Sequence, residues 1–173
     1  MIHGTSPPGL MLSIFTDERI TMAIDLAQAL CSITTKATAK DWRDAIRLSG
    51  AGLVAGGAAT KEYTNQMIAA VEEHGPYIVI APGIALAHGR PSDAVLTGGL
   101  SWVSLKEPVE FGHPKNDPVS LVIGLAAVDH TTHMEVLKAL AGILSQKGKL
   151  EQLVAASTED ELRSLLTDAA SAA

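Results

Sequence analysis

VSLVIGLAAV, residues 119–128, is the stretch that decides the fold. It holds no charged residue, and almost every position in it is apolar. A strand that is apolar on both of its faces is expected in a sheet that helices cover on both sides. A helix needs about 20 apolar residues to cross a bilayer, far more than this run provides. We therefore predict a buried strand in an α/β protein.

Two further strands are predicted before it. Residues 77–80, YIVI, are β-branched or aromatic and lie between Pro76 and the Pro82-Gly83 pair, which is typical of a short strand. Residues 96–105 form the next predicted strand. Prolines mark residues 106–118 as a loop between this strand and the last one.

Apolar residues recur at helical spacing on both sides of the strands. Two helices precede the strands and three follow them, at residues 41–54, 60–74, 133–146, 149–156 and 158–167. Residues 12–30 are expected to hold a short strand or a helix, and residues 1–12 and 168–173 read as loose ends. This order predicts a three-layer α/β/α sandwich with a small, mixed β-sheet.

The composition fits one compact domain inside the cell. With 173 residues, 47% of them hydrophobic, the chain can bury one core but has little room for a second. The net charge of −6 argues against nucleic acid as a partner, although an acidic surface still suits a basic protein. Cys31 is the single cysteine and cannot form an internal disulfide, and the N-terminus lacks the basic region of a signal peptide. We expect a cytoplasmic protein.

Of the six histidines, His88 has the context of a reactive group. It lies in APGIALAHGRP, residues 81–91, where small residues surround a single imidazole, and we place it in a loop after the strand at 77–80. Gly89 leaves room for a bulky group to approach the ring, and the planar guanidinium of Arg90 suits phosphate oxygens. From composition alone, an incidental histidine in a turn is an equally good interpretation of His88.

His133 stands at the start of a predicted helix. Thr132 and Glu135 fit a capping box, and Asp129 is a competing N-cap. Either cap puts His133 in the first turn, where unpaired N–H groups and the helix dipole favour an anion. His133 shares a helix face with Leu137, so we expect its ring to point across the sheet edge. A partly buried, hydrogen-bonded histidine without such a role is the alternative.

Other features give weaker signals. His130 and His133 have the spacing of a metal pair and, with His88, would define a metal-dependent hydrolase, but the sequence offers no obvious further ligand. Cys31 has no activating neighbour and is expected to be structural. The glycines of residues 50–57 lack the Lys-Ser/Thr pair of a P-loop, and we expect them to allow close helix packing.

Taken in order, the motifs resemble those of a known family. The chain is similar to the IIA component of the bacterial phosphoenolpyruvate-dependent sugar phosphotransferase system (PTS), in its mannitol/fructose-type superfamily, and most of all to the ascorbate-type branch. The resemblance covers residues 12–167 and rests on WRDAIRL (42–48), HGPYIVIAPG (74–83), GIALAHG (83–89), HGRP (88–91), NDPV (116–119), LAAVD (125–129), His133 and ALA (139–141).

The resemblance implies a single EIIA type-2 domain, residues 1–173 with a core at about 12–167, that carries a phosphoryl group. His88 would be phosphorylated, and His133 would help to hold the phosphoryl group. The donor would be the phosphocarrier protein HPr and the acceptor a cysteine of the IIB component, which serves the IIC permease during uptake of ascorbate or a related sugar. The donor is itself a phosphohistidine, so no cofactor or metal is expected. The sequence leaves open whether the chain forms a homodimer.

The chain departs from the family pattern at two points. The family usually has proline immediately before the reactive histidine, where this chain has Ala87 and therefore no fixed φ. The arginine that some mannitol-type members carry upstream has no clear match, and Arg90 or His74 is the candidate for its part. Ala87 is the one feature that favours an alternative function, a PTS-like regulatory binding module with weakened transfer.

Overall fold

The structure is a computed structural model that describes residues 26–172. Most of the element expected at residues 12–30 lies outside this range. A short helix, α2 (Leu26–Ala29), leads directly into strand β1 (Leu30–Ala37), which the sequence analysis did not predict beyond its first residue. β1 is an edge strand, and its apolar residues Leu30, Cys31, Ile33 and Ala37 do not alternate regularly with polar ones, so the period-2 pattern of a strand was missing.

Five strands form one mixed sheet in the order β1-β4-β5-β3-β2. β1 pairs with β4 and β3 pairs with β5 in parallel, whereas the β4–β5 and β2–β3 pairs are antiparallel. These strands are β2 (Val79–Ala81), β3 (Ile84–His88), β4 (Gly99–Val109) and β5 (Val119–Ala126). The apolar stretch that predicted the fold class is β5, at the centre of the sheet.

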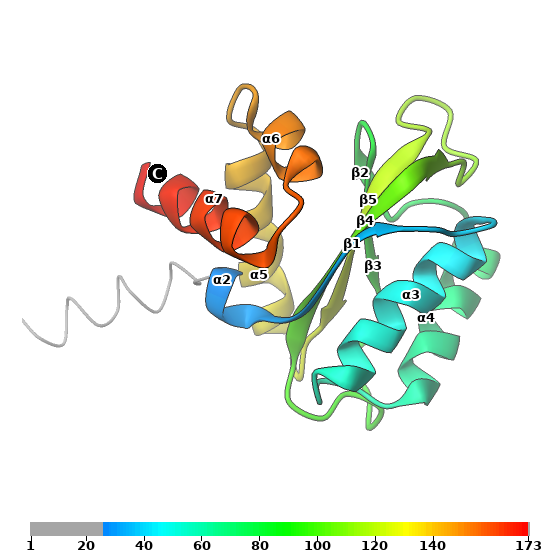
Figure 1. The fold of residues 1–173 in the computed structure, drawn as a ribbon. Coiled ribbons are helices and arrows are strands. Elements are labelled where there is room, and N and C mark those ends of the chain that lie inside the picture. The colour runs from blue at the N-terminus through cyan, green and yellow to red at the C-terminus, as the bar shows by residue number, and fades with distance from the viewer. Residues whose placement is uncertain (1–25, 173) are drawn as a thin grey trace, which may run out of the picture.

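Helices cover both faces of the sheet (Figure 1). One face carries α3 (Trp42–Ala55) and α4 (Lys61–His74). The other carries α2 together with α5 (His130–Leu144), α6 (Lys149–Ala155) and α7 (Glu159–Ala172). The predicted three-layer α/β/α sandwich with a mixed sheet is confirmed. Among residues 26–172, every helix is too short or too polar to cross a membrane.

β5 contributes to two hydrophobic cores because its side chains point to both faces of the sheet. Val122 and Ala126 belong to the core under α3 and α4. Leu121, Ile123 and Leu125 belong to the core under the helices of the other face. Helices therefore exclude water from both sides of this strand, which accounts for its few polar positions.

His88 lies on a strand that the sequence did not reveal. The residues after the predicted strand at 77–80 were expected to form a loop, but β2 and β3 form a hairpin with Gly83, at φ 80°, in its turn. Ala85 and Ala87 gave no strand signal because alanine is a weak strand former. Both are nevertheless fully buried in the core under α3 and α4.

The strand predicted at 96–105 is β4, and it runs on into the region expected to be a loop. Residues 106–108 are exposed, and the register against β5 shifts between Ser104 and Val109. Pro108 is thus accommodated at an irregularity, where a missing N–H costs little. The proline was therefore a misleading loop signal.

Gly50 permits the close contact between α3 and α4. A Cβ atom at position 50 would lie 2.0 Å from Thr64 Oγ1 and 2.8 Å from Thr64 Cβ, so rotating the threonine would not remove the overlap. The expectation of close helix packing is confirmed at this glycine. Gly57 has another role, because its φ of 79° is a left-handed conformation that suits the end of a helix.

Candidate active site

His88 is the last residue of β3 and faces α5. Ile84 and Leu86 on the same strand belong to the core under α5, so the alternation of the strand sends His88 to that side as well. In the parallel β3–β5 pair, His88 lies opposite Leu125, and both strands end at the same edge of the sheet. The imidazole is therefore held at a strand end, and its expected place in a loop is wrong.

The imidazole of His88 is held in one tautomer. Nδ1 lies 2.8 Å from the carbonyl oxygen of Leu86, and because a carbonyl can only accept, Nδ1 carries the proton and donates. Burial lowers the pKa of His88 below 6.5, and the hydrogen bond to Leu86 opposes this shift in part. Near neutral pH the ring is uncharged and Nε2 has a free lone pair, as a nucleophile requires.

His133 reaches His88 from the start of α5. Asp129 is the N-cap of this helix, because its carboxylate accepts a hydrogen bond from the N–H of Thr132 at 2.7 Å. The centroids of the His133 and His88 rings lie 4.9 Å apart, so His133 does point across the sheet edge. Of the two caps that the sequence left open, Asp129 is correct and Thr132 is wrong.

This cap changes the electrostatics at the start of α5. The carboxylate of Asp129 offsets part of the positive end of the helix dipole, and the N–H bond from Thr132 is the main cause of its lowered pKa. The N–H of His133 is also engaged, donating to the Asp129 carbonyl at 3.2 Å. The N–H groups of Thr132 and His133 are therefore not available to an anion beside His88, and the His133 ring is the group of α5 that faces it.

His133 is itself uncharged near neutral pH. Burial lowers its pKa, and the charges of His88 and His130 lower it further. His130 stacks on His133 with ring planes 7° apart and centroids 6.3 Å apart. A neutral imidazole still carries one ring N–H, so His133 can donate one hydrogen bond to a group bound at His88.

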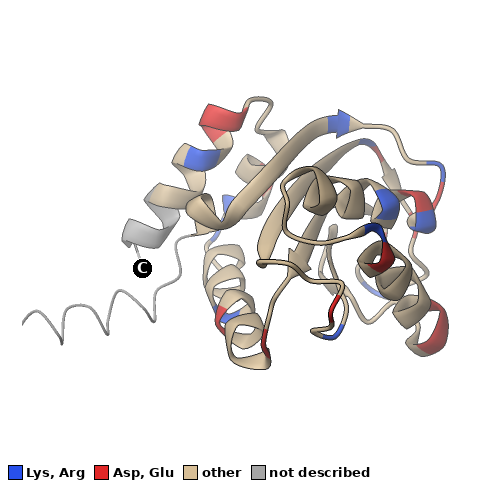
Figure 2. Cartoon of the chain, turned by 90° about the horizontal axis from the view of Figure 1, so that it is seen from below, with Lys and Arg blue, Asp and Glu red and all other residues tan. Residues whose placement is uncertain are grey.

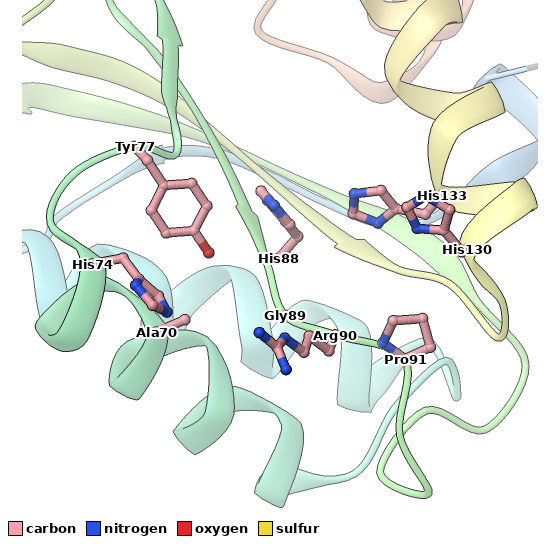
Figure 3. A pocket seen from close by; sticks show the side chains of 9 residues that line it. All are labelled: Ala70, His74, Tyr77, His88, Gly89, Arg90, Pro91, His130 and His133. Atoms are coloured by element: carbon pink, nitrogen blue, oxygen red, sulfur yellow. The ribbon is translucent and has the colours of Figure 1, made fainter.

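An open pocket of about 550 Å³ lies beside the His88 ring (Figure 3). Its walls come from α4, the α4–β2 connection, the end of β3 and the start of α5. The lining residues are Ala70, His74, Tyr77, His88, Gly89, Arg90, Pro91, His130 and His133. All four site residues that the sequence predicted belong to this set.

Arg90 and His74 differ in their freedom to meet an anion. Arg90 is exposed, and the three ion pairs within the described residues do not involve it. His74 is the last residue of α4, and its Nε2 lies 3.7 Å from a carboxylate oxygen of Glu73. Over the described residues, Lys and Arg are interspersed with Asp and Glu (Figure 2). Arg90 is the better placed of the two candidates.

A buried tyrosine joins the two strands that end at the pocket. Tyr63, on α4, is 1% exposed, and its hydroxyl donates to the carbonyl of Leu125 at 2.7 Å. The same hydroxyl accepts from the N–H of Gly89 at 2.9 Å. It thereby ties the residue after His88 to the end of β5. Sequence reasoning missed this role, because Tyr63 counts there only as one of the apolar residues at helical spacing in the predicted helix 60–74.

Tyr77 is a second pocket residue that sequence reasoning missed. It was assigned to a strand, but it lies in the connection before β2 and is 44% exposed. Its ring stands edge-on to that of His88, with centroids 5.5 Å and planes 86° apart. This is the geometry of an edge-to-face aromatic contact.

Metal and thiol chemistry gain no support from the geometry. Within residues 26–172, no three His, Cys, Asp or Glu side chains are placed to hold a metal ion. Cys31 lines a different cavity, and its Sγ lies 3.9 Å from the carbonyl oxygen of Gly52, to which it donates. Burial raises the pKa of this thiol, which suits a structural role.

Comparison with known proteins decides the family. The model of the family "Phosphoenolpyruvate-dependent sugar phosphotransferase system, EIIA 2" matches residues 30–169. The chain belongs to this family. The resemblance inferred from the ordered motifs is confirmed, and this EIIA protein is a member of a family of phosphoryl-transfer components.

A curated relative and two solved structures agree with this assignment. The ascorbate-specific PTS system EIIA component of Shigella boydii is 40% identical over 136 residues, which are 78% of this chain and 88% of that protein. The mannitol-specific cryptic phosphotransferase enzyme IIA of Escherichia coli has a TM-score of 0.74 at 32% identity, over 84% of this chain and 99% of that one. The complex of enzyme IIA-Mtl and phosphorylated enzyme IIB-Mtl of Escherichia coli matches with a TM-score of 0.71 at 30% identity, over 79% and 94%.

Removing the hydroxyl of Tyr63 should destabilise this EIIA protein. In Tyr63→Phe the Leu125 carbonyl and the Gly89 N–H lose their shared partner, and we expect the free energy of unfolding to fall by about 1–3 kcal/mol. Urea denaturation measures the change. Tyr77→Phe is the matched control, because that tyrosine is 44% exposed and the expected change is within about 0.5 kcal/mol. Equal effects of the two substitutions would contradict the bridging role.

The stability of the protein should fall as the pH drops through the ordinary histidine range. Burial lowers the pKa of His88 below 6.5, so in acid the unfolded chain binds a proton that the folded chain does not. Stability then rises with pH across this window and is complete above about 6.5. In His88→Asn, the free energies of unfolding at about pH 5 and about pH 8 should differ from each other by less than in the wild type. An unchanged difference would show that His88 titrates normally.

Proposed function

We propose that this EIIA protein carries a phosphoryl group on Nε2 of His88. It accepts the group from phospho-HPr and passes it to a cysteine of the IIB component of a sugar permease. The observation that carries this proposal is the state of His88: a half-buried, neutral imidazole with Nδ1 bonded to Leu86 and Nε2 left as the reactive nitrogen, at the wall of an open pocket.

The chemistry balances without a further reactant. The lone pair of Nε2 attacks the phosphorus of the donor phosphohistidine, the donor N–P bond breaks, and the donor ring keeps the electron pair. In the second step a thiolate of IIB attacks the same phosphorus and the bond to His88 breaks. The scheme uses no cofactor and no metal, because the phosphoryl group arrives already activated.

The neighbouring side chains supply the electrostatics of this transfer. Arg90 is exposed at the pocket wall and can neutralise phosphoryl oxygens with its planar fork. His133 can donate a ring N–H to the group on His88. His74 lines the same pocket and, when protonated, adds a charge that Glu73 partly offsets.

The relatives support a substrate class and a partner for this protein. The Shigella boydii relative is named as ascorbate-specific at 40% identity, so we propose ascorbate or a related sugar as the compound that the linked IIC permease imports. The mannitol enzyme IIA of known structure forms a complex with phosphorylated enzyme IIB, which supports IIB as the partner here. We propose that residues 1–173 act as one domain in the cytoplasm, where phospho-HPr and the inner face of the permease meet.

The phosphorylation site can be tested by matched histidine substitutions. His88→Asn keeps an amide N–H near the position of Nδ1 for the Leu86 carbonyl but has no nucleophile, so labelling by phosphoenolpyruvate, enzyme I and HPr should be abolished. His113→Asn is the control, because His113 lies outside the pocket and an amide oxygen can replace its Nδ1 as acceptor for Lys115 and Asn116. Mass spectrometry of intact protein and peptides is the readout.

Two outcomes would overturn the assignment of His88. Labelling of His88→Asn to the level of the wild type would place the phosphoryl group elsewhere. A wild-type chain that stays unlabelled would favour the regulatory binding module that Ala87 suggested in the sequence.

His133 should affect the transfer of the phosphoryl group from His88 to IIB, and not its acceptance by His88. In His133→Ala we expect His88 to be labelled still, while onward transfer to IIB slows roughly tenfold to a hundredfold, because a hydrogen bond to a charged group contributes about 1.5–3 kcal/mol. His133→Gln keeps a donor and should recover part of the rate. Rapid-quench transfer kinetics and the melting temperature are measured on the same variants. If only the melting temperature falls, His133 is a structural residue.

A further inference from the structure

The hydroxyl of Tyr77 is a polar group on the pocket wall that the transfer scheme leaves unused. Within residues 26–172, no hydrogen bond to this hydroxyl is found, although other hydroxyls near the site, such as those of Tyr63 and Ser92, do form hydrogen bonds. Figure 3 shows the Tyr77 hydroxyl turned into the pocket, on the side where Arg90 lies. A donor without a protein partner beside a candidate nucleophile is suited to bind what that nucleophile carries.

The main chain holds Tyr77 in place although the side chain is partly exposed. Gly75, at φ 85°, ends α4 and turns the chain towards β2. The N–H of Tyr77 donates to the Gly75 carbonyl at 2.9 Å, and the N–H of Val79 donates to the Pro76 carbonyl at 3.1 Å. These bonds lie on both sides of Tyr77, so its ring is presented to the pocket by an ordered turn.

Tyr77 and His133 contact the His88 ring from different directions. Figure 3 shows them on opposite sides of His88, and the ring centroids lie 5.5 Å away for Tyr77 and 4.9 Å away for His133. The Tyr77 ring also stands edge-on to His74, at 6.2 Å. The phenol ring therefore forms the wall of the pocket between α4 and β3.

We propose that Tyr77 is a phosphoryl-binding residue: its hydroxyl donates to an oxygen of the phosphoryl group on His88, and its ring shields the N–P bond from water. The inference rests on the proposed phosphorylation of His88. It makes Tyr77 a third hydrogen-bond donor to the phosphoryl group, beside Arg90 and His133. The shielded reaction is hydrolysis, in which a water oxygen attacks phosphorus, the N–P bond breaks, the His88 ring keeps the electron pair and inorganic phosphate leaves.

The phenol is in the right protonation state for this role. Burial raises the pKa of Tyr77 above its ordinary value of 10.0, and the positive charge of Arg90 opposes the shift only in part. The hydroxyl therefore keeps its proton near neutral pH and donates. A phosphoryl oxygen is an ionised acceptor, and hydrogen bonds to ionised groups are stronger than those between neutral groups.

Chemical phosphorylation tests this role without any partner protein. Potassium phosphoramidate transfers its phosphoryl group to an imidazole nitrogen and releases ammonia, so it can load His88 directly. Wild type, Tyr77→Phe, Tyr77→Ala and the control Ile80→Ala are loaded, mapped by mass spectrometry and followed by ³¹P NMR. Ile80 is 42% exposed on β2 and is not among the pocket residues, so its substitution tests the loss of an exposed side chain from the same segment.

The two parts of the Tyr77 side chain should give separate results. Tyr77→Phe lacks the hydroxyl, so the ³¹P resonance of phospho-His88 should move and the rate of loading from phospho-HPr should fall roughly tenfold. Tyr77→Ala lacks the ring as well, so its phosphohistidine should also hydrolyse several times faster. Ile80→Ala should match the wild type in all three measurements.

The test of Tyr77 can fail or succeed independently of the proposed relay, the phosphoryl transfer from phospho-HPr. If both Tyr77 variants keep the wild-type ³¹P resonance and hydrolysis rate, the phosphoryl-binding role is overturned, whatever phospho-HPr does. If phospho-HPr fails to load the wild type while phosphoramidate labelling shows the expected differences at His88, the relay is overturned and Tyr77 still binds the group.

Discussion

The parallel pairing of β3 with β5 is the constraint on which the site depends. It sets His88 opposite Leu125 and brings both strand ends to one edge of the sheet. From the end of β5 the chain passes into α5, which places His133 against the ring of His88. A slip of one residue in β3 would turn His88 to the face of α3 and α4 and remove it from the pocket. The hydroxyl of Tyr63 bonds across the two strand ends, so strand register and site geometry are fixed together.

His88, the proposed nucleophile, is kept neutral, and the permanent positive charge of the pocket lies apart from its ring. Burial favours the uncharged forms of His88 and His133, whereas Arg90 is exposed at the pocket wall. A carrier must form a bond to phosphorus and then lose it again. A nitrogen with a lowered pKa suits both steps, since its lone pair is free near neutral pH and its weak basicity makes it a good leaving group. In the proposed transfer, the positive charge of Arg90, held further out, would stabilise the phosphoryl oxygens without protonating the ring.

Periodicity and ordered motifs were enough to predict the layers, the helices and the four histidine and arginine side chains of the pocket. They could not decide between Asp129 and Thr132 as the cap of α5, because aspartate and threonine are both common N-cap residues. They missed β3, because its alanines are weak strand formers whose burial depends on the neighbouring strands and helices. The roles of Tyr63 and Tyr77 were also hidden. An aromatic residue counts as apolar in a sequence pattern, and the hydroxyl of Tyr63 meets a carbonyl 62 residues away in the chain.

Ala87 shows why a departure from a family motif has to be judged in its structural setting. A proline before the reactive histidine would restrict φ at that residue. In this protein Ala87 is already fully buried and paired in register with Gly124 of β5, while the preceding N–H, that of Leu86, donates to the carbonyl of Ile78 at 2.8 Å. At Ala87 the pairing with β5, and just before it the hydrogen bond of Leu86 to Ile78, restrict the backbone where a proline would otherwise do so. The orientation of His88 is set by this pairing and by its own bond to Leu86, so the missing proline does not loosen the ring.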